Sequence, residues 1–406
     1  MKKFIPIITM ILLFSGCNIK ENDPVFDYNK KSAVVVETNN NFGLALLKQV
    51  LLNEDDPNVM ISPTSVSLAL GMAYNGAEDS TKRAFEELFD YVGLTREEVN
   101  NITKELIEVL TTNSSGNLLE IANSVWYQEG FPVIQGFIDL NTTYYGAEVI
   151  EQDFMAADAI EKINNWVSDK THKKITEIVD QLDPATRMIL INALYFNCVW
   201  QVEFDKDETQ TKAFYNEDGS KYADVEMMLT ESNFKYAMTD EFSAVELPYK
   251  DEKFSMLLFL PAYNSSLSAF LGELNGENWT EWTAALSSAP RVQVSLPKFK
   301  FDYDRSLAED LQAMGLGIAF TDMADFSGIS SIPLLISDVI HKTYIDVNEE
   351  GTEAAAVTAV VFETTSVGGD ETIVLEFNRP FFFAIRENSS SAIVFAGKVT
   401  QPAYEK

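Results

Sequence analysis

Residues 349–366 read EEGTEAAAVTAVVFETTS, and this stretch combines the features of a flexible loop and of a β-strand. Its third residue is a flexible glycine, Gly351, and a run of small residues follows. Residues 357–362, VTAVVF, have high β propensity. Two interpretations are open: an ordinary strand preceded by an alanine-rich turn, or a loop that can become a strand.

The alternation of side chains along this segment favours the second interpretation. Successive side chains of a strand point to opposite faces, so every second residue shares a face. On one face all residues are small or apolar: Thr352, Ala354, Ala356, Thr358, Val360 and Phe362. The other face carries Glu353 and Glu363, which we expect to face solvent. Since an exposed strand-forming segment is an aggregation hazard, it implies a use, namely entry into a sheet from its N-terminal end.

The rest of the chain changes from helical to strand-like patterns. Helical patterns are Phe42–Leu52, a segment with Ser62 as cap and Pro63 in its first turn, Ala156–Asp169 and Leu307–Met314, while Glu86–Leu110 is acidic and amphipathic. Strand-like patterns are Ala122–Tyr127, Val225–Met228, Ser243–Tyr249, Phe254–Leu260 and Val292–Leu296, with Val374–Ile385 and Ser391–Val399 as a closing pair. This order predicts an α+β fold. Because no interior linker or repeat divides the 406 residues, we expect one large domain.

The composition excludes several classes of partner. The formal net charge is -32, from 30 basic and 62 acidic residues, so the surface should repel nucleic acids and heparin-like polyanions. The acidic residues are spread along the chain, as on a solvated surface. With only Cys17 and Cys198, and Cys17 expected to be used elsewhere, no disulfide is predicted.

The N-terminus has the pattern of a targeting signal. Lys2 and Lys3 precede an apolar run, Phe4–Phe14, that is too short to span a bilayer. The run ends in FSGC at residues 14–17, which resembles a bacterial lipobox with Cys17 as the lipidated residue. We therefore predict a lipoprotein signal peptide at 1–16 and a polar tether at 17–36, on the outer membrane or cell surface; the alternative is an ordinary secretory signal and a secreted protein.

No enzyme motif is present in the sequence. There is no G-x-S-x-G, H-E-x-x-H, P-loop or paired Cys/His spacing, so no metal or cofactor is expected. Of the two histidines, His172 lies among lysines and is expected at the surface. His341 lies in an apolar stretch, where a core histidine is favoured over a catalytic base. A hydrolase that uses His341 stays open only as a minor hypothesis, and no enzyme activity is predicted.

Several motifs, in order and spacing, resemble the serpin family from about Phe42 to Pro402. They are NVMISPTS at 58–65, NALYF at 192–196 with Trp200 and Phe204 after it, VEMM at 225–228, His341-Lys342, and FNRPFFF at 377–383. The resemblance implies a serpin domain at 37–406 with three β-sheets, about nine helices and an exposed reactive-centre loop at 349–376.

The resemblance also implies roles for particular residues. The hinge of the loop is Glu349, Glu350, Gly351, Thr352, Glu353, Ala354, Ala355 and Ala356. Counting from Gly351, the scissile bond falls at Thr365-Ser366, with Val361, Phe362 and Thr364 as alternative sites because the loop is a few residues longer than usual. A hydrogen-bonded shutter of Ser62, Ser65, Asn192 and His341 lies beneath the sheet, Trp200 lies where the loop first enters, and Cys198, where many relatives have glycine, is expected to be a buried, inert thiol.

The function that follows is inhibition of proteases. In serpins the protease cuts the loop, which then inserts into the central sheet and traps the acyl-enzyme. The small inward residues predict inhibition rather than substrate behaviour, and we expect a monomer. The residue before the cut predicts the target: Thr365, Val361 or Thr364 suits an elastase-like serine protease and Phe362 a chymotrypsin-like one, with a papain-like cysteine protease as a further target. The alternative is a non-inhibitory serpin-fold binding protein.

Overall fold

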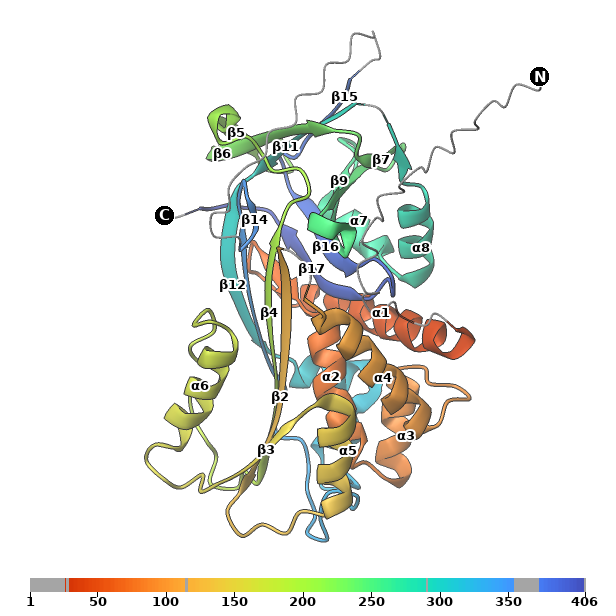
Figure 1. Cartoon of the computed structure of the whole chain (residues 1–406), viewed down its shortest axis with the longest axis vertical. Helices are drawn as coiled ribbons and strands as arrows, with labels where there is room; N and C mark the ends of the chain where they lie inside the picture. The colour runs from red at the N-terminus through yellow and green to blue at the C-terminus, as the bar shows by residue number, and fades with distance from the viewer. Residues whose placement is uncertain (1–25, 27–28, 114–115, 290, 354–371, 405–406) are drawn as a thin grey trace, which may run out of the picture.

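The structure is a computed structural model that describes residues 26, 29–113, 116–289, 291–353 and 372–404. These residues form nine α-helices and three β-sheets in a single domain (Figure 1). The α+β class and the arrangement of three sheets with nine helices are therefore confirmed.

The helices begin where the sequence supplies caps. The side chain of Ser62 accepts from the Ser65 N–H, and Pro63 occupies the first turn, as predicted. Thr95 and Glu98 form a capping box at another helix start. The α-helices are α1 Lys30–Leu51, α2 Pro63–Tyr74, α3 Asp79–Leu88, α4 Arg96–Thr111, α5 Gln135–Tyr145, α6 Ala159–Lys170, α7 Leu267–Glu273, α8 Gly276–Ala284 and α9 Ala308–Leu311.

The central sheet has six strands in the order β12-β13-β14-β4-β2-β3. Its strands are β12 Phe299–Ser306, β13 Ile340–Val347, β14 Gly351–Thr352, β4 Met188–Val199, β2 Asn117–Gln128 and β3 Glu148–Gln152. In Figure 1, α6 lies on one face of this sheet, and α2, α4 and α5 lie on the other. Helix α6 covers β2 and β4 by packing Ile163 and Val167 in one cluster with Trp126 and Ile191. We call the face under α6 the outer face and the opposite one the inner face.

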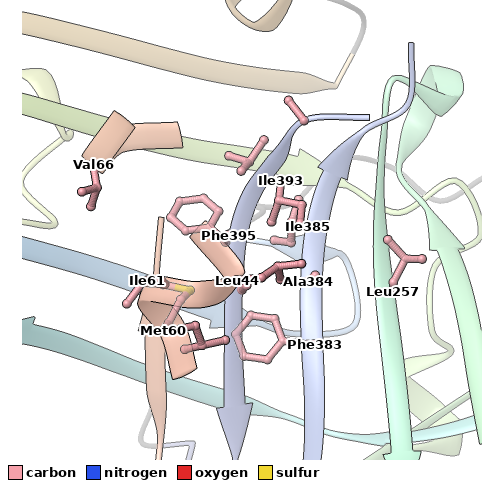
Figure 2. Packing of buried hydrophobic residues seen from close by; sticks show 14 of the residues in the cluster. Leu44, Met60, Ile61, Val66, Leu257, Phe383, Ala384, Ile385, Ile393 and Phe395 are labelled. Atoms are coloured by element: carbon pink, nitrogen blue, oxygen red, sulfur yellow. The ribbon is translucent and has the colours of Figure 1, made fainter. Parts of the chain in front are cut away.

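The other two sheets hold much of the core, and the seven-stranded one packs against the central sheet, since Phe196 of β4 contacts Phe254 and Phe395. The seven-stranded sheet is β1 Val59–Ile61, β17 Ile393–Val399, β16 Phe381–Glu387, β9 Phe254–Pro261, β8 Phe242–Pro248, β7 Lys235–Met238 and β10 Ser287–Ser288. The four-stranded sheet is β15 Ile373–Glu376, β11 Val292–Pro297, β6 Lys221–Ser232 and β5 Gln210–Tyr215. Fully buried residues such as Phe383 and Ile385 of β16 pack with Met60 of β1 and Leu44 of α1 (Figure 2).

Two predicted boundaries are wrong. Val374–Ile385 is not one strand: β15 ends at Glu376, and β16 begins at Phe381 in a different sheet. The break follows from Pro380, which has no N–H for a sheet ladder. The amphipathic stretch 86–110 is likewise divided between α3 and α4, with Asp90 and Gly93 at positive φ between them.

The predicted tether at 17–36 is too long. Helix α1 begins at Lys30, capped by the side chain of Asn29, and Val35 and Val36 are buried in the core. The apolar run AVVV at 33–36 belongs to this helix and not to a tether. Among the described helices, none is both long enough and apolar enough to cross a membrane.

Candidate loop-insertion site

The first residues of the predicted loop already belong to the central sheet. Thr352 of β14 pairs with Val347 of β13 on one side and with Cys198 of β4 on the other, and Gly351 pairs with Val199. At the other end of the loop, residues 373–376 form β15, which pairs with β11. The prediction of an exposed loop at 349–376 is therefore wrong at its N-terminal end, where Gly351 and Thr352 are buried, whereas Val374 in β15 is 58% exposed.

Both residues of β14 fit only because of their size and chemistry. A Cβ on Gly351 would lie 2.0 Å from the carbonyl oxygen of Cys198, so no other residue enters here without movement of β4. Thr352 is 3% exposed, and its hydroxyl lies 2.5 Å from the hydroxyl of Tyr249. The expectation that Thr352 faces inward is thus confirmed.

Below β14 the facing edges of β4 and β13 have no common partner. Strand β4 pairs with β2 along its other edge, and β13 pairs with β12. Within the residues that the structure describes, β4 and β13 are joined only through the two residues of β14. We call these two facing edges the insertion slot. Unpaired strand edges are ready to accept another strand.

Trp200 fixes the chain where it approaches the slot. Its indole N–H donates to the carbonyl of Asn348 at 3.0 Å, and its ring stacks on Tyr249 with centroids 4.4 Å apart. The backbone N–H groups of Trp200 and Phe204 donate to the carbonyls of Glu350 and Glu349. Trp200 therefore contacts the residues that directly precede β14.

Two ion pairs hold the side chains of this approach. Lys298 lies 3.1 Å from Glu349, with 11% and 9% of the two side chains exposed, and Lys206 pairs with Glu350. Burial alone would raise the pKa of Glu349, but its own backbone N–H, Lys298 and Thr209 together hold the pKa below its usual range. Lys298 also lies over the ring of Tyr404, so the C-terminal segment covers the pair.

Lys298→Met should destabilise the uncleaved protein. Loss of the ammonium group leaves the Glu349 carboxylate nearly buried and unpaired, which costs roughly 3 kcal/mol. Chemical unfolding measures the loss. Lys300→Met is the matched control, because its pair with Asp346 is at 3.7 Å and its side chain is 40% exposed; it should cost less than about 1 kcal/mol. Equal losses in the two variants would contradict the assignment.

Three of the four predicted shutter residues, Ser62, Ser65 and His341, lie together where α2 begins beside β13 of the central sheet. The backbone N–H of Ser62 donates to Nε2 of His341 at 3.0 Å, and the hydroxyl of Ser62 donates to the carbonyl of Val394. The Ser65 N–H donates to that same hydroxyl oxygen. Burial lowers the pKa of His341 to about 4, and an Nε2 that accepts a hydrogen bond is unprotonated. His341 is thus a neutral structural group, as predicted.

The pKa of His341 predicts a pH dependence of stability. The folded-state pKa of about 4 is below the ordinary 6.5, so the unfolded chain binds more protons between these values. The contribution is present above pH 6.5 and falls by about 3 kcal/mol as pH drops to 4. His341→Gln should remove this contribution, so the difference in unfolding free energy between parent and variant should change by about 3 kcal/mol between pH 7 and pH 4. Parallel curves from pH 7 to pH 4 would contradict the prediction.

Asn192, the fourth predicted shutter residue, has a different partner. Its Nδ2 donates to Oδ1 of Asn123 at 2.7 Å, and Asn123 donates to the carbonyl of Tyr145. No hydrogen bond joins Asn192 to His341 in the described structure, and the Oδ1 of Asn192 is buried without a partner. A buried acceptor without a partner is costly, so a donor that reached this oxygen would stabilise the site.

Three further predictions have structural outcomes. Cys198 is confirmed as buried, and burial raises the pKa of its thiol far above the ordinary value. His172 is confirmed at the surface, where its Nε2 lies 2.6 Å from Glu120. The expectation that Glu353 faces solvent is wrong, because its side chain is only 9% exposed and lies 2.8 Å from Lys174.

The remaining predicted site residues lie outside the described residues. They are Cys17, Ala354, Ala355, Ala356, Thr358, Val360, Val361, Phe362, Glu363, Thr364, Thr365 and Ser366. Conversely, sequence reasoning missed Tyr249, Lys298, Lys174 and Asn123. Each of these lies far along the chain from the hinge or the shutter, and no local pattern marks it.

Comparison with known proteins assigns this fold and site to a class. The family model for "Serpin (serine protease inhibitor)" matches residues 37–402. A serpin-like protein of Methanosarcina mazei is 36% identical, over 98% of this chain and 96% of its own. Iripin-8 of Ixodes ricinus is 37% identical, over 90% and 93%. The crystal structure of tengpin, a thermophilic serpin, in its native state has a TM-score of 0.83 at 31% identity, over 92% and 95%.

The chain therefore belongs to the serpin family. Members of this family are mostly protease inhibitors rather than enzymes. The thyroxine-binding globulin structure, which has a TM-score of 0.82 at 25% identity over 92% of this chain and all of its own, is an example of a serpin fold that binds a small molecule.

Proposed function

We propose that this protein is a suicide-substrate inhibitor of serine proteases, in which cleavage of the loop starts insertion into the slot between β4 and β13. The observation that carries the proposal is the position of β14. A short strand already pairs with both edges of the slot, and it is continuous with the predicted loop. After cleavage, each loop residue that follows β14 needs only to extend the hydrogen-bond ladders that β14 already forms with β4 and β13.

The register of β14 defines which residues would meet in the inserted state. Since Thr352 pairs with Cys198 and Val347, each further residue moves one position back along β4 and β13. Residue 358 then lies between Asn192 and His341, and residue 362 lies opposite Met188, where β4 begins. A threonine hydroxyl at 358 is able to donate to the unpartnered oxygen of Asn192.

The inner face of the slot suits the alternation of the loop. Thr352 points inward to Tyr249, so Ala354, Ala356, Thr358, Val360 and Phe362 would follow it to the inner face. None of these residues carries a charge, and insertion would therefore leave no unpaired ion in the core. This is the physical reason to favour an inhibitor over a simple substrate.

The residue before the cut would select the target protease. We place the scissile bond at Thr365-Ser366, and a small residue there fits an elastase-like pocket. Cleavage after Val361 or Thr364 would fit the same class, whereas cleavage after Phe362 would fit a chymotrypsin-like enzyme. A papain-like cysteine protease is a further proposed target of the same loop.

Mass spectrometry after mixing with a panel of proteases tests the proposal. We expect an SDS-stable complex with at least one protease, together with a released C-terminal fragment that begins at Ser366. A fragment that begins elsewhere relocates the bond and redefines the target class. Cleavage by every protease without any stable complex would overturn inhibition.

A binding function is the second candidate, and one cavity favours it. A cavity of about 1080 Å³ lies between α1, α7 and α8, with Leu267, Leu271 and Met314 among its apolar walls and Lys398 among its polar ones. Its size is typical of a small-molecule pocket. A non-inhibitory carrier would show no gain in thermal stability when its loop is cut, which separates it from the inhibitor.

We further propose that the protein is a bacterial envelope lipoprotein anchored through Cys17, on the outer membrane or cell surface. Because α1 begins at Lys30, the tether would be residues 18–29. Cys17→Ala should move the protein from the membrane fraction to the medium or periplasm in a bacterial host. If the variant and the parent distribute alike, the chain is secreted by an ordinary signal.

A further inference from the structure

Glu353 directly follows β14 and is the last described residue of the hinge. Its backbone N–H still donates to the carbonyl of Asp346 in β13 at 2.6 Å. Its φ is +56°, in the left-handed region that side chains other than glycine rarely adopt. The strand pairing with β13 thus extends to the Glu353 N–H, and the backbone of Glu353 itself is no longer extended.

A strained turn after α6 lies over the slot at the same point. His172 and Lys173, both non-glycine, have φ of +49° and +66°. The ring of His172 lies 4.2 Å from that of Tyr195 in β4, and Lys174 lies 5.0 Å over the ring of Tyr344 in β13. The turn therefore rests on both strands that border the slot. Strained backbone of this kind persists only where the surroundings hold it, and it gathers at functional sites.

Lys174 is the cation that faces the carboxylate of Glu353. Its Nζ lies 2.8 Å from Oε1 of Glu353. The other groups that face this carboxylate are the hydroxyl of Tyr195, which hydrogen bonds to it, and the carboxylate of Asp346, which repels it. Burial raises the pKa of Glu353, so the charged form depends on Lys174 for its stability.

We propose that Lys174 is a positioning residue that holds the hinge two residues deep in the insertion slot until the loop is cut. This inference rests on the proposed inhibitory function, and it names the residue that fixes where the hinge lies before insertion begins. Without Lys174, the Glu353 carboxylate would be buried beside Asp346 with no cation, and would move toward water. That movement would draw Thr352 out of the sheet.

Loss of the Lys174–Glu353 pair should lower the fraction of cleavage events that end in a trapped protease. Insertion competes with hydrolysis of the acyl-enzyme, and a hinge that starts outside the sheet begins that competition late. In an extended strand the side chain at 353 stays on the outer face, opposite to Thr352. Lys174 can therefore keep its partner while insertion proceeds, so the ion pair favours the first step without opposing the later ones.

Charge variants at the two positions test the pair. Lys174→Met and Glu353→Lys should each raise the number of inhibitor molecules consumed per trapped protease by roughly tenfold. The double variant K174E/E353K should restore a value close to the parent's. Lys170→Met is the matched control. Lys170 lies 2.6 Å from Glu148, and this ion pair is not at the slot, so its loss should leave the number of inhibitor molecules consumed per trapped protease unchanged. Failure of the exchanged pair to restore inhibition would overturn the ion-pair explanation.

Hydrogen exchange provides a second readout that needs no protease. In the intact parent, the amide protons of Gly351–Glu353 should exchange slowly, and Lys174→Met should speed them by roughly tenfold while Lys170→Met does not. Equal exchange in parent and Lys174→Met would overturn the inference. If the parent traps no protease at all, the inhibitory proposal fails, while the exchange measurement still decides whether Lys174 holds the hinge.

Discussion

Thr352→Arg should convert the protein from an inhibitor into a substrate. Thr352 is buried on the inner face of the central sheet, where its hydroxyl lies against the uncharged hydroxyl of Tyr249. An unpaired buried charge costs several kcal/mol, so insertion should slow by roughly 100-fold or more. Hydrolysis of the acyl-enzyme would then win. The measurement is the yield of SDS-stable complex with a protease that the parent traps.

The controls separate charge from size and from the hydroxyl group. Thr352→Ser keeps the hydroxyl that faces Tyr249 and should trap protease like the parent. Thr352→Val keeps the size but leaves the Tyr249 hydroxyl unpaired, which should cost about 1–3 kcal/mol of stability and spare the complex. All three variants should be cut at the same bond. Survival of the complex in Thr352→Arg would show that the trap does not require insertion at this position.

The behaviour of Thr352 and Glu353 shows what the sequence could predict about the hinge. Alternation is a local property, so the inward direction of Thr352 followed from the residues themselves. The same reasoning gave the wrong surroundings for Glu353, because the outer face is covered by the turn that carries Lys174. Nothing near Glu353 in the sequence reveals a lysine 179 positions away.

The shutter shows the same limit of local sequence patterns. Ser62 and His341 were predicted together through the family resemblance, and the structure joins them. Asn192 was assigned to the same group, but its preference for Asn123 depends on the pairing of β2 with β4. In contrast, the break at Pro380 was readable from the sequence, since a proline within an apolar run argues against one continuous strand.

Cleavage within the loop should raise the melting temperature of the protein by roughly 10–20 °C. Among the residues that the structure describes, the edges of β4 and β13 below β14 have no common partner, and the Oδ1 of Asn192 is buried without one. A new strand would supply partners for both edges, and each hydrogen bond adds about 0.5–1.5 kcal/mol. The burial of Val360 and Phe362 would add roughly 1.5–3 kcal/mol for each side chain.

The comparison that isolates insertion uses the same cut in two proteins. Parent and Thr352→Arg, each cleaved at the same bond and purified, have identical chain breaks and differ only in whether the hinge can enter. The cleaved parent should melt well above the intact parent, whereas cleaved Thr352→Arg should melt close to its own intact form. If both cleaved proteins gain stability equally, the gain arises elsewhere than in the slot. If neither gains, the loop does not insert, and the chain is better explained as a non-inhibitory member of its family.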